Sequence, residues 1–105
     1  MMNQLDKEIF DLKEEKRTLA SLERLLVNPD FKKVIEDDFL TKHPLDLVMS
    51  KGTLSLDPEY EKDIDRQLEC VALFKMYLQN KASRIADIDL DISEAETLRD
   101  QQTQG

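Results

Sequence analysis

Hydrophobic residues recur every seven positions in two stretches of the chain, one near each end. The first run consists of leucines only, and the second mixes β-branched residues with one leucine: Leu5, Leu12, Leu19 and Leu26, then Ile64, Val71, Leu78, Ile85 and Ile92. Seven residues are close to two turns of an α-helix, so each run draws one apolar stripe along one side of a helix. The pattern therefore predicts two long helices.

Two dipeptides mark where helices begin. Asn28-Pro29 and Asp57-Pro58 each place an N-cap residue before a proline at the first helical position, where the missing N–H costs nothing. These boundaries predict a first long helix over about 3–27, connector helices over about 29–52, and a second long helix over about 58–86 or beyond.

Two further residues divide the connector. Pro44 is expected to start a second short helix with Leu45, Val48 and Met49 as its apolar side, and Gly52 is placed to end it in a left-handed conformation.

The segment after Ala86 supports two interpretations. Residues 87–92 alternate aspartate with isoleucine or leucine, which suits an extended segment, and Ser93 with Glu96 could cap a new short helix. Against this, apolar residues also keep helical spacing through the segment: Ile85, Ile88, Ile92 and Ala95. A continuing or slightly broken helix is the favoured interpretation, with a frayed tail over 101–105.

These elements predict an all-α protein: an antiparallel helical hairpin of two long helices with a short helical connector, forming a single domain over 1–100. The expected core is Leu12, Leu19, Leu26, Phe31, Ile35, Phe39, Ile64, Leu68, Val71, Phe74 and Leu78. A chain this small buries a modest core, and the heptads leave apolar surface over. We therefore expect a homo-oligomer, foremost a dimer, or a partner helix from another protein.

Charge narrows the classes of partner. The chain has 105 residues, 36% of them charged, and a formal net charge of −8. From Arg84 onward the chain has six acidic and two basic residues, so half of the excess negative charge lies in the last fifth of the chain. A net acidic protein repels nucleic-acid backbones and anionic membrane surfaces, so we expect neither as a direct partner.

The residues that could carry chemistry are isolated. His43 has no companion ligands, and the single Cys70, beside the apolar stripe of the second long helix, is expected to be a buried inert thiol. The triplet Asp87, Asp89 and Asp91 resembles the opening of a calcium loop, but Ile92 and Leu98 stand where that loop needs glycine and glutamate. We therefore expect no enzyme, no cofactor and no metal.

Two segments carry a resemblance to a protein family. They are Leu22-Glu-Arg-Leu-Leu-Val-Asn-Pro-Asp-Phe-Lys32 and Asp65-Arg-Gln-Leu-Glu-Cys-Val-Ala-Leu-Phe-Lys-Met-Tyr-Leu-Gln79. Over about residues 20–80 the chain resembles small acidic all-helical proteins of tailed bacteriophages, often encoded near virion structural genes. The resemblance implies a viral accessory or virion-associated protein, located in the host cytoplasm or in the virion, and it assigns no catalytic or binding residue.

The sequence thus predicts a soluble, non-enzymatic interaction protein that docks onto a larger phage or host assembly. Its start is polar and lacks the apolar core of a signal peptide, and no apolar run approaches the length of a membrane span. The candidate docking residues are Phe39, Leu40, Leu45 and Met49 on the connector, together with the acidic helix end. The alternative is an acidic decoy that inhibits a host nucleic-acid-binding enzyme, with Asp87, Asp89 and Asp91 in place of phosphates.

Overall fold

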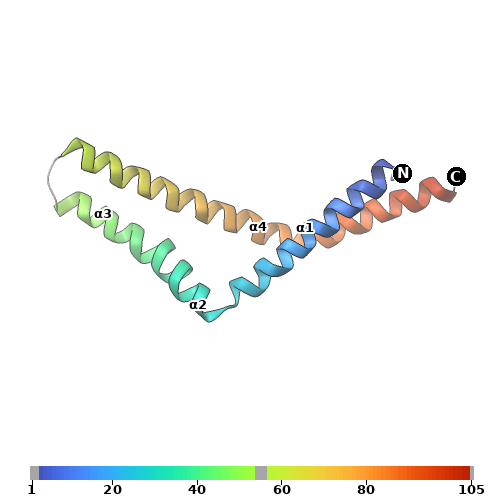
Figure 1. Cartoon of the computed structure of the whole chain (residues 1–105), viewed down its shortest axis with the longest axis horizontal. Helices are drawn as coiled ribbons and strands as arrows, with labels where there is room; N and C mark the ends of the chain where they lie inside the picture. The colour runs from blue at the N-terminus through green and yellow to red at the C-terminus, as the bar shows by residue number, and fades with distance from the viewer. Residues whose placement is uncertain (1–2, 54–56, 105) are drawn as a thin grey trace. The chain divides into compact units, whose positions relative to one another are not determined.

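The computed structural model describes residues 3–53 and 57–104, and every regular element in these ranges is a helix (Figure 1). The all-α class is confirmed. In chain order the elements are α1 (Gln4–Leu26), α2 (Pro29–Phe31), the π-helix η1 (Lys32–Lys42), α3 (His43–Thr53) and α4 (Pro58–Gln104).

The chain forms two compact units. Unit 1 combines Met1–Leu25 with Asn80–Gly105, and unit 2 is the continuous stretch Leu26–Gln79. Helix α4 contributes its C-terminal half to unit 1 and its N-terminal half to unit 2. All nine heptad residues are buried or half-buried, so one stripe on α4 supplies the core of both units.

Unit 1 is an antiparallel pair of helices. Ion pairs join Asp6 to Arg99, Lys13 to Glu96 and Glu15 to Arg84. Residues later in α1 thus pair with residues earlier in α4, as in antiparallel helices. Between the helices lies an apolar cluster of buried and half-buried residues: Leu19, Ile88 and Ile92, with Leu12 and Ile85 packed against them. Ile9 and Ala95 are also buried. Burial of this seam is the main favourable term for the pair.

The expected hairpin of two long helices is not confirmed, since α1 has 23 residues whereas α4 has 47 and contributes to both units. Residues 87–92 are helical, because Ile88 and Ile92 are buried in unit 1 while Asp87 and Asp89 remain exposed. The helix also passes through Ser93, so no new helix starts there. Residues 101–104 continue α4, and Gly105 lies outside the described residues.

Unit 2 packs the connector against the N-terminal half of α4. The ring of Phe39 meets the ring of Phe74 edge-on at 5.8 Å, and Lys51 Nζ lies 2.7 Å from an oxygen of Asp65. This hydrogen bond raises the pKa of Lys51. These two contacts again run antiparallel along the two segments. Among the described residues of this unit, Ile64 and Val71 on α4 are buried.

The connector contains no break at Pro44. Helices α2, η1 and α3 follow one another without interruption from Pro29 to Thr53. The expected short helix starting at Pro44 is therefore the continuation of η1, whose wider turns accommodate the proline. Gly52 does not end α3 in a left-handed conformation, because the helix includes it and no described residue has a positive φ.

Both expected N-caps are confirmed. The Asn28 side-chain oxygen accepts hydrogen bonds from the backbone N–H groups of Asp30 and Phe31, at 2.9 and 3.2 Å. The Asp57 carboxylate accepts one from the N–H of Glu59 at 3.1 Å. Each cap satisfies donors that the first helical turn leaves without a partner.

Candidate functional site

The four candidate docking residues on the connector differ in exposure. Phe39 and Leu40 in η1 are half-buried, and Phe39 packs between the rings of Phe74 and His43 inside unit 2. Leu45 and Met49 in α3 are exposed, at 58% and 61%. The structure therefore brings Leu45 and Met49 together on one outward face, and it places Phe39 and Leu40 in the packing of unit 2.

An exposed apolar face extends this pair. Val48 lies one turn from Leu45 on α3 and is 53% exposed. On the N-terminal half of α4 a second set has the same spacing and 54–59% exposure: Leu73, Met76 and Tyr77. Residues three and four apart lie on one side of a helix. We call these two trios the α3 face and the α4 face. The sequence pattern did not separate the α4 face from the core stripe beside it.

The three aspartates near the start of the acidic segment also differ. Asp87 is exposed, Asp89 pairs with Lys16 Nζ at 2.5 Å, and Asp91 is half-buried beside Arg84. The sequence alone groups them by spacing, whereas the helix distributes them over its surface and one flank of the seam.

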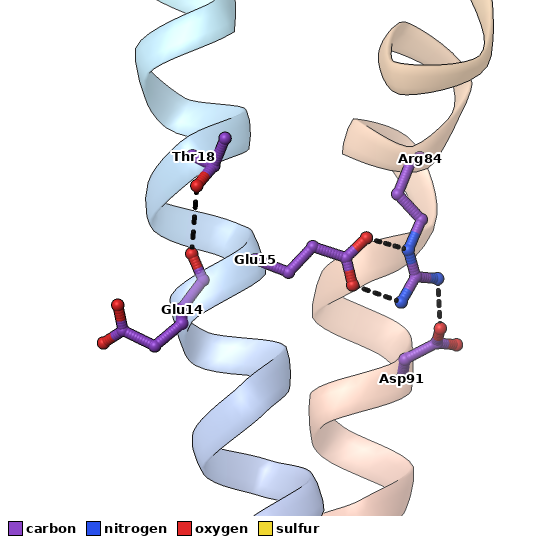
Figure 2. A network of polar contacts seen from close by, with 5 residues as sticks. All are labelled: Glu14, Glu15, Thr18, Arg84 and Asp91. Atoms are coloured by element: carbon purple, nitrogen blue, oxygen red, sulfur yellow. Dashed lines mark hydrogen bonds and ion pairs between the residues drawn. The ribbon is translucent and has the colours of Figure 1, made fainter. Parts of the chain in front are cut away.

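The centre of the polar contacts in unit 1 is the guanidinium of Arg84 (Figure 2). Its Nε and Nη2 donate to the two carboxylate oxygens of Glu15, at 2.8 and 3.1 Å, and its Nη1 donates to Asp91. The Arg84 and Glu15 side chains are 28% and 31% exposed. A two-pronged contact of this kind fixes the relative position of both groups.

This contact shifts the ionisation of both partners. The hydrogen bond from Arg84 lowers the pKa of Glu15 below the ordinary 4.5, an effect that burial opposes and the charges of Arg84 and Lys81 assist. The hydrogen bonds to Glu15 and Asp91 raise the pKa of Arg84 further. Glu15 and Arg84 are therefore both charged at neutral pH, and their contact is an ion pair beside the apolar seam.

Most of the acidic C-terminal segment has basic neighbours within unit 1. Of its six acids, four are paired: Asp89 with Lys16, Asp91 with Arg84, Glu96 with Lys13, and Asp100 with Arg99. A phosphate mimic needs acids that form a stripe with few bases between them. Here two of the four pairs, those of Asp89 and Glu96, join α4 to α1, and the other two lie within α4.

Within 3–53 and 57–104, no group of three or more histidine, cysteine, aspartate or glutamate side chains is placed to hold a metal ion. Cys70 is exposed, so the expected buried thiol is wrong: it lies on the outward side of α4, away from Val71. In the same ranges, no helix has an apolar stretch long enough to cross a membrane.

Comparisons with protein-family models, with curated proteins and with solved structures give no match.

Proposed function

We propose that the chain is a non-enzymatic interaction protein, and that its first partner is a second copy of itself. The observation that carries this proposal is the pair of outward apolar faces in unit 2. Each face consists of three apolar or aromatic side chains that are 53–61% exposed, in a chain of which 36% is charged. Interfaces are enriched in methionine and tyrosine, and both residue types occur here.

The exposure of the two faces supports a contact with a second copy. Each of their six apolar or aromatic side chains is more than half exposed. Neighbouring exposed apolar side chains of this kind mark interaction surfaces. A second copy supplies a layer of the same length and chemistry, so it can cover these faces symmetrically.

Analytical ultracentrifugation of three variants tests the proposal. The first carries Leu45→Glu and Met49→Glu on the α3 face, and the second carries Leu73→Glu and Met76→Glu on the α4 face. The control is Leu90→Glu, since Leu90 is equally exposed but lies on α4 in unit 1. We expect a mass near twice 12.2 kDa for the parent and the control. At least one face variant should sediment as a monomer with unchanged helical circular dichroism.

Two results would contradict self-association. One is a parent protein that stays at 12.2 kDa at millimolar concentration. The other is a dimer that both face variants leave intact, which would place the interface elsewhere.

We further propose that the assembled protein docks onto a larger bacteriophage structure. The resemblance of residues 20–80 to small proteins of tailed phages supports this setting. Mass spectrometry of purified particles tests it: recovery of the chain with the particle supports a virion-associated role. Its presence only in the soluble fraction of infected cells, without any associated phage protein, argues against it.

A further inference from the structure

The connector contains an unusually long π-helix. In η1 the backbone hydrogen bonds reach back five residues, as from the N–H of His43 to the carbonyl of Asp38. The side-chain hydroxyl of Thr41 also donates to a carbonyl five residues earlier, that of Glu36, at 2.8 Å. Helix η1 has 11 residues, whereas π-helices mostly occur as single turns inside α-helices. A stretch of this length needs a cause in the sequence.

The first cause is the spacing of the half-buried residues. Along the connector the half-buried residues with apolar or aromatic side chains recur every four or five positions: Phe31, Ile35, Phe39 with Leu40, His43 with Pro44, and Leu47. The polar residues Glu36 and Ser50 are half-buried beside them. An α-helix brings residues three and four apart to one side, but a helix bonded five residues back has a wider turn. If the segment were α-helical and Leu47 kept its place, Phe31 and Ile35 would rotate away from α4. Lys33, which is exposed here, would turn toward α4 in their place.

The second cause is Pro44. Proline has no N–H, and in an α-helix its ring collides with the carbonyl four residues earlier, here that of Leu40. The backbone of His43 nevertheless stays helical, with φ −60° and ψ −51°. A wider turn just before the proline lets the helix continue without this collision.

We propose that η1 is a register device: it absorbs one surplus residue in the connector, so that the apolar positions before and after it face α4 together. Counted at α-helical spacing, the segment from Ile35 to Leu47 is one residue too long to place both on one side. Removing one residue from η1 returns Phe31, Ile35, Leu40 and Leu47 to one α-helical face. The wider turns of the π-helix therefore align the apolar residues in the same way as the removal of one residue would. The apolar spacing and Pro44 favour the π-helix over an α-helix in this segment.

Single-residue deletions test this proposal. We expect deletion of Asp37, an exposed residue in η1, to leave unit 2 folded, with a melting temperature close to that of the parent. The matched control is deletion of Lys75, an exposed charged residue of α4 between Val71 and Leu78. Helix α4 has no surplus residue at this point. Deleting Lys75 therefore rotates Val71 and Leu78 by about 100° relative to each other. This change should abolish the cooperative transition of unit 2.

Hydrogen-bond couplings measured by NMR give an independent readout. In the parent, the amide of His43 should couple to the carbonyl of Asp38, five positions earlier. In a variant that combines the Asp37 deletion with Pro44→Ala, amides of the segment should couple to carbonyls four positions earlier. The proposal is overturned if the parent already shows the four-residue pattern, if the Asp37 deletion unfolds unit 2, or if the combined variant keeps the five-residue pattern.

Discussion

Glu15 and Arg84 lie 69 positions apart in the sequence, and in unit 1 they meet through two hydrogen bonds, at 2.8 and 3.1 Å. Only one alignment of α1 against α4 allows both bonds to form. Polar contacts beside an apolar seam are a known way to fix the register and direction of paired helices. The leucine and isoleucine stripes supply the driving force for pairing, and the Glu15–Arg84 contact selects one register among those that the stripes allow.

The Glu15 contact should make the stability of unit 1 depend on pH. Because the folded pKa of Glu15 is lowered, the unfolded chain binds more protons in the window below the ordinary value of 4.5. The contribution of Glu15 is therefore complete above that value and is lost as the pH falls through the folded pKa. Thermal melts from pH 7 to pH 2 should show this loss in the parent. A Glu15→Gln variant should lack that part of the pH dependence, and an identical profile in both proteins would exclude this role.

The apolar seam should dominate the stability of unit 1. Leu19 is 2% exposed, so Leu19→Ala leaves a cavity and should cost about 2–5 kcal/mol of unfolding free energy. Leu25 lies on the same helix but is 45% exposed, so Leu25→Ala should stay within about 0.5 kcal/mol. Urea denaturation followed by circular dichroism at 222 nm measures both. Equal losses would show that the seam is not centred on Leu19.

The aromatic contact in unit 2 can be isolated by a double-mutant cycle. Phe39 and Phe74 meet edge-on, a geometry worth about 0.5–1.5 kcal/mol beyond buried area. Replacing each with leucine, singly and together, keeps most of the apolar volume. We expect a coupling energy in that range between the two positions. Strict additivity of the single changes would mean that the rings contribute only by burial.

The Asn28 cap offers a test at the start of the connector. Asn28→Ala removes an acceptor for two backbone N–H groups and should cost about 1 kcal/mol. Asn80→Ala is the control, since Asn80 is an exposed residue inside α4 and its substitution should change stability by less than about 0.5 kcal/mol. Hydrogen exchange of the Asp30 and Phe31 amides should accelerate only in the Asn28 variant.

Periodicity and caps predicted the helices well for a physical reason. Both signals are local: a heptad marks one side of a helix, and an Asn-Pro or Asp-Pro pair marks its first turn. All nine heptad residues accordingly lie on inward sides, and both caps form as expected. The C-terminal end of α4 stayed open in the sequence, because alternation of aspartate with aliphatic residues over 87–92 also fits a strand, although the favoured interpretation was a continuing helix.

The pairing of helices could not be predicted from such signals, because register depends on contacts between distant residues. In the sequence, Glu15 and Arg84 look like ordinary surface charges. The π-helix did leave a trace, since the apolar pairs Val34-Ile35 and Phe39-Leu40 recur five positions apart. The candidate docking residues Leu45 and Met49 were recognisable as one side of a helix. The sequence did not indicate whether α4 covers that side of α3 or leaves it exposed, because this depends on where α4 lies.

The division of the chain into two units has a consequence for its synthesis on the ribosome. Unit 2 is continuous in sequence and lies between the two segments that form unit 1. Helix α1 is therefore synthesised before unit 2, whereas its partner in unit 1 is synthesised after it. The apolar side of α1 stays uncovered, open to other proteins, for as long as unit 2 is being made. Unit 1 can close only after all of unit 2 has been synthesised, and until then α1 is exposed to premature association.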